Sequence, residues 1–397
     1  RLGDRLAAAR VVGLHRQEQR RRRSLHALRG RRGGAGAQVL HILSSVDYVG
    51  VGSGAVSGDS GSGASALVTG YQPCHEALEE ALADFLGREA VLVTSSGYLA
   101  NLAALTALVQ RGDTVLQDRL CHASLVDAAR LSDAQLKRYP HADASAAQRQ
   151  LNGTGGHRLL VTDGVFSMDG DPAPLAELAA LASDESATLV VDDAHGIGVL
   201  GEGGGGLCEV LQLGERDVPV LIGTLGKAFG AAGAFIAGSH ALIEHLENHG
   251  RSVIYSTALS PATAGAALAA LERVRDGNAL RRRLASHIEV LKRGAAERDI
   301  QLLPSDTPIQ PLVIGDPARA LAVSAALEQR GYLVTAIRPP TVPAGTSRLR
   351  ITLSAAHEPD QVTGLLDALA EALAAEDGRA RGRASPPTCD ESPEAVG

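Results

Sequence analysis

The sequence predicts an α/β fold in which helices cover both faces of a mostly parallel β-sheet, with a smaller α+β unit at the C-terminal end. Short apolar runs alternate with helical patterns from about residue 75 onward. Several runs are apolar on both faces, which is typical of buried parallel strands. With 397 residues the chain exceeds the size of one ordinary core, and the alternation changes character near residue 276. We therefore expect a large and a small domain.

The large domain begins with a helical pattern at residues 75–87, which ends at a glycine, a residue that often caps a helix C-terminus. A β-rich run at 90–95 precedes a second helical pattern at 97–112, and a further helix is expected at 174–183. The other predicted strands are short apolar runs, at 113–118, 157–163, 187–193, 218–224 and 233–239. Because helical patterns separate most of these strands, they are expected to run parallel.

A long helical pattern at 278–300 opens the small domain. The runs that follow it alternate between strand and helix patterns: strands at 309–315, 332–338 and 347–354, and helices at 319–331 and 361–375. The predicted organisation has four parts: an N-terminal arm and irregular segment at 1–60, the large domain at 61–275, the small domain at 276–378 and a disordered tail at 379–397. The tail is polar and contains proline and glycine.

The composition limits the expected partners and location. The formal net charge of −7, with 3% aromatic residues and no tryptophan, argues against nucleic acid as a partner. We expect no membrane association, because no apolar run reaches the roughly 18–20 residues of a membrane span. The arginine-rich stretch at 16–32 is expected to be a solvated helix and loop, although a transit peptide or a phosphate-binding arm has a similar composition.

The cysteines lack the spacing of a zinc site or of a CxxC motif. They predict no metal, no disulfide framework, and a reducing, cytoplasmic location. Their positions are Cys74, Cys121, Cys208 and Cys389.

Polar residues follow the predicted strands at the carboxyl ends, where ligands gather in a parallel sheet. Lys227 is the most informative, because a lysine among small residues between two core strands is rarely buried without a partner. The other residues at these ends offer a carboxylate, two imidazoles, hydroxyl groups and a glycine at a helix start. They are Gly97, Tyr98, Cys121, His122, Ser167, Asp192, His195 and Thr224.

Pyridoxal 5'-phosphate (PLP) requires nearly all of these groups. A lysine such as Lys227 binds its aldehyde as a Schiff base, and a carboxylate such as Asp192 keeps its pyridine nitrogen protonated. The helix that starts at Gly97 supplies backbone N–H groups for the phosphate. One imidazole can cover the ring, and the other can hydrogen-bond the phenolic oxygen. The residues therefore predict a PLP site, although each alone has an ordinary structural interpretation as a cap, a turn or a core residue.

Two glycine-rich stretches offer other interpretations. Residues 196–201, GIGVLG, fit G-x-G-x-x-G after a predicted strand, so a nicotinamide-dependent oxidoreductase stays open as an alternative. The polar DDAH that precedes these glycines, and the further glycines that follow, fit a dinucleotide site poorly. Residues 223–230, GTLGKAFG, fail the phosphate-loop template because Leu221 and Ala228 occupy two of its key positions.

Four stretches carry a specific family resemblance: RLCHASLVDAARLS, TDGVFSMDGDPAPLAEL, VVDDAHGIGVLG and GTLGKAFGAAGAF. With them the chain resembles the α-oxoamine synthases, PLP enzymes of fold type I, from about residue 61 to about residue 375. The resemblance implies that Lys227 bears the cofactor, that Asp192 pairs with the pyridinium and that His122 stacks on the ring. It implies that His195 bonds the phenolic oxygen. It implies cofactor contacts for Ser167, Gly97, Tyr98 and Thr224, and a phosphate contact from a partner subunit for Thr257.

The same resemblance assigns the substrate side. Arg350 matches the arginine that binds the amino-acid carboxylate, and Arg338 and Thr341 line the same region, as does His122. Within the family, IQPLVIGD, VIYSTALSPA and the stretch at 335–358 most resemble the homodimeric acyltransferases of biotin biosynthesis. These condense L-alanine with a pimeloyl thioester, carried by coenzyme A or acyl carrier protein.

Sister activities remain as alternatives: glycine C-acetyltransferase, 5-aminolevulinate synthase and serine palmitoyltransferase, or an inactive relative. The departures from the family pattern are Val46 in place of an asparagine, a shortened segment at 51–60, Ala66 before LVTG, Cys121 and Asp163.

Overall fold

The computed structural model describes residues 41–42 and 61–384. The predictions for the arginine-rich stretch, Val46, the segment 51–60 and the tail beyond 384 therefore lie outside the described residues.

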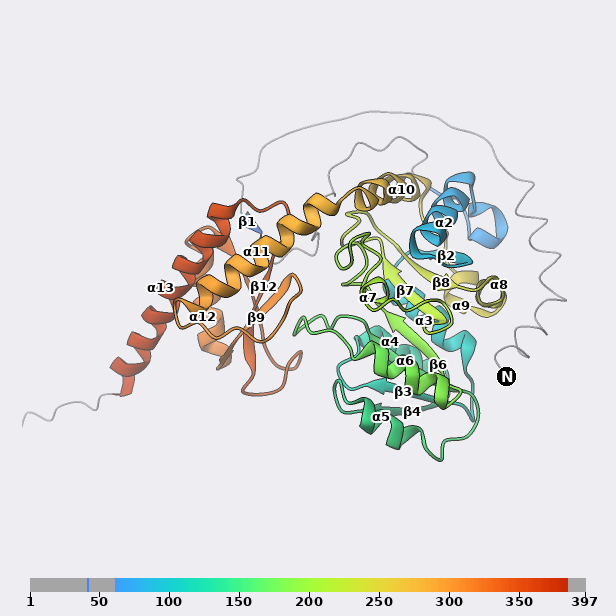
Figure 1. Ribbon diagram of the computed structural model, residues 1–397, viewed down its shortest axis with the longest axis horizontal. Coiled ribbons are helices and arrows are strands. Elements are labelled where there is room, and N and C mark those ends of the chain that lie inside the picture. The colour runs from blue at the N-terminus through green and yellow to red at the C-terminus, as the bar shows by residue number, and fades with distance from the viewer. Residues whose placement is uncertain (1–40, 43–60, 385–397) are drawn as a thin grey trace, which may run out of the picture.

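A seven-stranded sheet forms the centre of the large domain (Figure 1), in the order β2-β8-β7-β6-β5-β3-β4. All neighbouring strands are parallel except β8, which runs antiparallel to β2 and β7. The predicted α/β fold with a mostly parallel sheet is thus confirmed. The strands are β2 Ala90–Thr94, β3 Thr114–Asp118, β4 Gln135–Tyr139, β5 Arg158–Asp163, β6 Thr188–Asp192, β7 Val220–Thr224 and β8 Ala234–Gly238.

Helices cover both faces of this sheet. One face packs against α3 and α8, and the other against α2, α5 and α6. Helix α2 ends at Gly87, whose φ of 61° is the left-handed conformation that glycine adopts without strain. The helices and helical turns of this domain are η1 Ala66–Gly70, α2 Pro73–Leu86, α3 Gly97–Leu108, α4 Ala123–Leu131, α5 Ala144–Leu151, α6 Leu175–Asp184, α7 Leu207–Val210, α8 His240–His249, α9 Arg251–Ile254 and α10 Pro261–Arg275.

The small domain follows α10 and contains a three-stranded antiparallel sheet in the order β11-β12-β9. The predicted strand at 332–338 is divided in two, and its first part pairs with the two residues of β1. Helix α13 continues beyond the predicted start of a disordered tail at residue 379. The elements are β1 His41–Ile42, α11 Asn278–Ala296, β9 Ile309–Gly315, α12 Pro317–Glu328, β10 Tyr332–Leu333, β11 Thr335–Ile337, β12 Ser347–Thr352 and α13 Pro359–Ala384.

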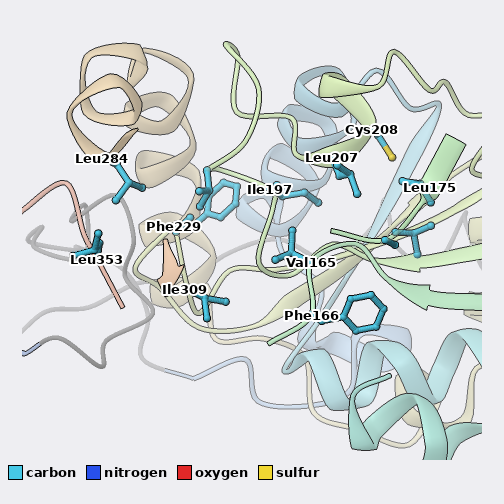
Figure 2. Packing of buried hydrophobic residues seen from close by; sticks show 14 of the residues in the cluster. Val165, Phe166, Leu175, Ile197, Leu207, Cys208, Phe229, Leu284, Ile309 and Leu353 are labelled. Atoms are coloured by element: carbon cyan, nitrogen blue, oxygen red, sulfur yellow. The ribbon is translucent and has the colours of Figure 1, made fainter. Parts of the chain in front are cut away.

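One hydrophobic cluster extends through both domains. Figure 2 shows Leu284 of α11, Ile309 of β9 and Leu353 in the same cluster as Val165 and Phe166, which follow β5. Buried polar contacts lie at the same junction, where the backbone oxygen of Gly170 accepts hydrogen bonds from two hydroxyl groups of the small domain, at 2.9 and 3.0 Å. The junction therefore fixes the small domain against the loop that follows β5. The exact division at residues 275 and 276 stays a prediction of the sequence.

Candidate active site

The carboxyl ends of β5, β6 and β7 bring the predicted site residues to one edge of the sheet. Asp163 and Asp192 are opposite each other at the ends of adjacent strands. The loop after β7 carries Lys227, and the loop after β6 carries His195. Because β6 lies between β5 and β7, the two carboxyl groups and the amine are held together by the sheet itself.

The Lys227 amine is half-buried, and no described residue forms a hydrogen bond or an ion pair with it. Burial lowers the pKa of Lys227, and the charge of Arg350 lowers it further, whereas Asp192 and Asp163 oppose this change. A lowered pKa favours the neutral, nucleophilic amine that a carbonyl group requires. The structure therefore places a partly buried amine with a lowered pKa in the loop after β7.

The Asp192 carboxylate is buried and is held from two sides. Its Oδ1 accepts a hydrogen bond from the backbone N–H of Ala194 at 3.1 Å, and its Oδ2 accepts one from Asn101 Nδ2 at 2.7 Å. Asn101 lies in α3 and is not among the residues predicted from the sequence. Its only sequence signal is a polar residue on a mostly apolar helix, which does not indicate a partner.

His122 is the N-cap of α4 and forms hydrogen bonds with Ser124 and Asp163. Its Nδ1 lies 2.7 Å from Ser124 Oγ, and its backbone N–H donates to Asp163 Oδ2 at 2.8 Å. Burial and the negative charge of Asp192 raise the pKa of Asp163 well above its usual range. Asp163 thus holds the backbone of His122 in place at the start of α4.

His195 and Arg350 both interact electrostatically with Lys227. Burial lowers the pKa of His195 well below its usual value, and electrostatic interactions with Lys227, Arg350 and His122 lower it further. A neutral imidazole is thus present, able to donate or accept one hydrogen bond. Arg350 is buried in β12, where its Nε donates to the backbone oxygen of Ser167 at 2.6 Å and its Nη1 to Thr352 Oγ1 at 3.2 Å. These bonds join the small domain to the loop that carries Ser167.

The start of α3 offers backbone donors close to the end of β2. The first intrahelical bond runs from Ala100 N to Ser96 O at 3.0 Å, so the N–H groups of Gly97 and Tyr98 precede the helical ladder. A Cβ built on Gly97 meets no atom within 4 Å. The Tyr98 ring is 44% exposed, and its hydroxyl donates to Asp127 Oδ2 at 3.0 Å.

The remaining predicted residues occupy more peripheral positions. Thr224 Oγ1 donates to the backbone oxygen of Gly233 at 3.1 Å and accepts from Gly226 N at 3.2 Å, which shapes the loop before Lys227. Thr257 pairs with Ser65 in an isolated bridge and forms no hydrogen bond with another predicted site residue within the described chain. Arg338 and Thr341 are exposed in the loop after β11, and Thr341 N donates to Arg338 O at 3.1 Å.

The glycine-rich stretch at 196–201 does not open a helix as a dinucleotide site requires. It forms turns after β6, and the next helix, α7, has only four residues. At Gly196 the backbone packs so closely against Asp193 that a side chain has no room. A Cβ there would lie 2.2 Å from Asp193 Oδ1. The nicotinamide alternative therefore has no support at this loop.

The residues present fit a PLP molecule in their chemistry. Within the described residues, a partly buried amine without a hydrogen-bond or ion-pair partner, a buried carboxylate and a neutral imidazole lie at one sheet edge, and N–H groups outside the helical ladder start a neighbouring helix. Among residues 41–42 and 61–384, no cluster of three or more histidine, cysteine or acidic side chains could hold a metal ion. In the same residues, no helix is both long and apolar enough to cross a membrane.

Known proteins share both the sequence and the fold. The family described as "Aminotransferase class I and II" matches residues 55–369. The 8-amino-7-oxononanoate synthase of Alkalilimnicola ehrlichii is 53% identical over 384 residues, which cover 94% of this chain and 97% of that protein. A solved structure of SPT with PLP as an internal aldimine has a TM-score of 0.81 at 30% identity, covering 86% of this chain and 88% of that chain.

A second solved structure, 8-amino-7-oxononanoate synthase from Francisella tularensis, has a TM-score of 0.73 at 27% identity, covering 85% of this chain and 99% of that chain. The predicted resemblance to the α-oxoamine synthases is thereby confirmed, and the chain belongs to the class I and II aminotransferase family.

Proposed function

We propose that this chain is a PLP-dependent acyltransferase that condenses L-alanine with a pimeloyl thioester, releasing CO2 and forming 8-amino-7-oxononanoate for biotin biosynthesis. The observation that carries the proposal is the unpaired Lys227 amine beside the buried Asp192 carboxylate, with Arg350 close enough to lower the pKa of that amine. The 53% identity to an 8-amino-7-oxononanoate synthase over nearly the whole of both chains supports this choice of substrates.

Bound at this site, PLP supplies an electron sink for the carbon that loses a proton. Lys227 would hold it, Asp192 would face its ring nitrogen, and the N–H groups of Gly97 and Tyr98 would bind its phosphate. Ser167 and Thr224 are proposed as further cofactor contacts. His122 would cover the ring and His195 would bond its oxygen, which a neutral imidazole can do.

The chain's own groups then position alanine and move its proton. Arg350 keeps Nη2 available in the described structure while Nε and Nη1 are engaged, so it can bind the alanine carboxylate. The Lys227 amine, when it is not itself bound to the cofactor, would take the proton from Cα, and burial inclines this amine toward the neutral form. Arg338 and Thr341 lie in the loop before β12 and are proposed to line the same substrate region as Arg350.

A serine palmitoyltransferase (SPT) activity is the second candidate. The solved SPT structure matches this chain with a TM-score of 0.81, compared with 0.73 for the Francisella tularensis 8-amino-7-oxononanoate synthase. Steady-state kinetics decide between the two. Alanine should be preferred over glycine and serine, and pimeloyl thioesters over acetyl, succinyl and palmitoyl thioesters. Comparing pimeloyl-coenzyme A with the pimeloyl carrier protein identifies the natural donor. A preference for serine with palmitoyl-coenzyme A would overturn the proposal.

We further propose a cytoplasmic homodimer in which Thr257 contacts the cofactor phosphate of the partner subunit. The surface beside Thr257 supports this, because Val68 of η1 and Tyr255 after α9 are 64% and 72% exposed. The two segments are tied together by a hydrogen bond from Ser65 Oγ to Ile254 O at 3.0 Å. Exposed apolar side chains in adjacent segments are typical of an interface.

Light scattering on the purified protein tests the assembly. The expected mass is twice the chain mass of 40.9 kDa, and Tyr255→Asp should shift the equilibrium toward one chain. Leu131→Asp, at a side chain that is also well exposed but lies on α4, is the matched control and should leave the mass unchanged. A wild-type protein with the mass of one chain at micromolar concentration would contradict the dimer.

A further inference from the structure

A continuous row of hydrogen bonds joins the Asp192 carboxylate to the His122 ring through two side chains that no motif indicates. Asn101 Nδ2 lies 2.7 Å from Asp192 Oδ2 and 2.8 Å from Ser124 Oγ. Ser124 Oγ lies 2.7 Å from His122 Nδ1, and Ser124 N also donates to this Nδ1, at 3.3 Å. Helices α3 and α4 and strand β6 each contribute to the row.

The chemistry of the donors fixes the direction of every bond. An amide NH2 group can only donate, so Ser124 Oγ accepts from Asn101 and keeps its own proton for His122. The backbone N–H of Ser124 can also only donate. His122 Nδ1 therefore faces two donors and must be the unprotonated nitrogen, which leaves the ring proton on Nε2. The row thus determines a tautomer as well as a position.

Asn101 and Ser124 are each only 1% exposed, so water does not compete for the bond between them, and His122, at the end of the row, is exposed. The other amide atom, Asn101 Oδ1, is buried without a hydrogen-bond partner in the described structure. An apolar residue would avoid this orphaned acceptor. The feature that favours asparagine here is its NH2 group, which can donate to two acceptors at once.

We infer that Asn101 is a positioning residue that couples Asp192 to His122, and that Ser124 transmits this coupling. Asn101 holds the carboxylate that would face the PLP ring nitrogen. Through Ser124 it also holds the imidazole that would cover the ring, with its proton on Nε2. This inference rests on the proposed function, since the groups being positioned are those assigned to the cofactor.

The test compares Asn101→Ala and Ser124→Ala with Thr106→Val as a matched control. Thr106 is also on α3, and its hydroxyl donates to the backbone oxygen of Leu102 at 2.6 Å, away from the row. Two properties are measured: the PLP dissociation constant, and the 15N signals of His122 in 15N-histidine-labelled protein without PLP, assigned by His122→Gln.

Asn101→Ala should weaken PLP binding by about tenfold or more, because Asp192 loses a charge-assisted hydrogen bond. It should also change the His122 nitrogen signals. Ser124→Ala should change those signals toward a mixture of tautomers while weakening PLP binding by less than about threefold, because Asn101 still holds Asp192. Thr106→Val should match the wild type in both properties.

A folded Asn101→Ala protein with wild-type PLP affinity and unchanged His122 signals would overturn the inference. If that variant does not fold, Asn101→Ser is measured instead, because a serine side chain at this position is too short to reach both Asp192 and Ser124. A wild-type protein that fails to bind PLP would refute the proposed function, whereas the His122 signals without PLP would still test the row itself.

Discussion

Arg350 shows how one residue combines a fold contact with a role in the site. Its Nε and Nη1 are bound within the protein, so the guanidinium plane is fixed before any ligand arrives. Arg338 and Thr341, assigned to the same substrate region, are exposed on a loop and lack this constraint. We therefore propose that Arg350, rather than this loop, makes the main contact with the amino-acid carboxylate.

Arg350→Lys should raise the KM for alanine by roughly 10- to 100-fold, since lysine cannot reproduce the planar, multiple-donor contact. Arg338→Lys is the matched control and should change this KM by less than about threefold. Initial-rate kinetics at saturating thioester measure both. An equal effect of the two substitutions would contradict the assignment to Arg350.

The sequence indicates which proposed site residues share one edge of the sheet, for a physical reason. Lys227, Asp192 and His195 follow apolar strands directly, so strand prediction alone brings them to one edge. Asn101 and Ser124 lie within helices. Along the chain, Asn101 is 91 residues from Asp192 and 23 residues from Ser124. Such a contact depends on how the helices pack, which no local pattern contains.

At the scale of elements, His141 links the ends of β3 and β4 to the loop that carries Ser167. Its Nδ1 is 3.1 Å from Asp118 Oδ1, and its Nε2 is 2.8 Å from Asp171 Oδ2. Burial alone would lower the pKa of His141, but hydrogen bonds to these two carboxylates, and their charges, raise it to about 9. The charged imidazolium thus ties the loop to the sheet.

Because the folded-state pKa lies above the unfolded value of about 6.5, this link stabilises the fold fully below about pH 6.5 and loses its effect as the pH rises through about 9. His141→Gln should lower the free energy of unfolding by at most about 3 kcal/mol near pH 6, with a smaller difference near pH 10. Asp171→Asn should reduce the same pH dependence. Urea unfolding across this range measures it, and a difference that does not vary with pH would refute the link.

Strand β4 is an element that the hydrophobic pattern of the sequence does not predict. Three of its five residues, QLKRY, are polar, and all but Tyr139 are at least partly accessible; the strand lies at the edge of the sheet. The central strands are apolar on both faces and were predictable for that reason. An edge strand owes its conformation to pairing with β3 rather than to its own composition.

At the scale of the whole molecule, the two domains share one hydrophobic cluster, and the site lies where they meet. Arg350 from the small domain contacts the Ser167 loop of the large domain, and Arg348 pairs with Asp169 in the same loop. Leu353 is fully buried in the shared cluster (Figure 2). The small domain should therefore stabilise the loop and the site together.

Leu353→Ala should destabilise the protein by about 2–5 kcal/mol and accelerate amide exchange in both domains. Leu321→Ala, at a side chain in α12 that is 44% exposed, is the control and should cost less than about 0.5 kcal/mol. Hydrogen exchange with peptide resolution follows residues 158–192 and 309–352 separately. Faster exchange confined to the small domain would show that the two domains are not coupled.

The central claim is that Lys227 carries the cofactor. The sequence contains three lysines, Lys137, Lys227 and Lys292, so borohydride reduction of the PLP-loaded protein followed by peptide mass spectrometry gives a direct answer. Lys137 donates to Gln150 O at 3.5 Å and Lys292 pairs with Asp306, whereas the Lys227 amine has no described partner. We predict one pyridoxyl group per chain, on Lys227, and none on Lys227→Ala. A pyridoxyl group on Lys137 or Lys292, or an equal yield from Lys227→Ala, would contradict this account.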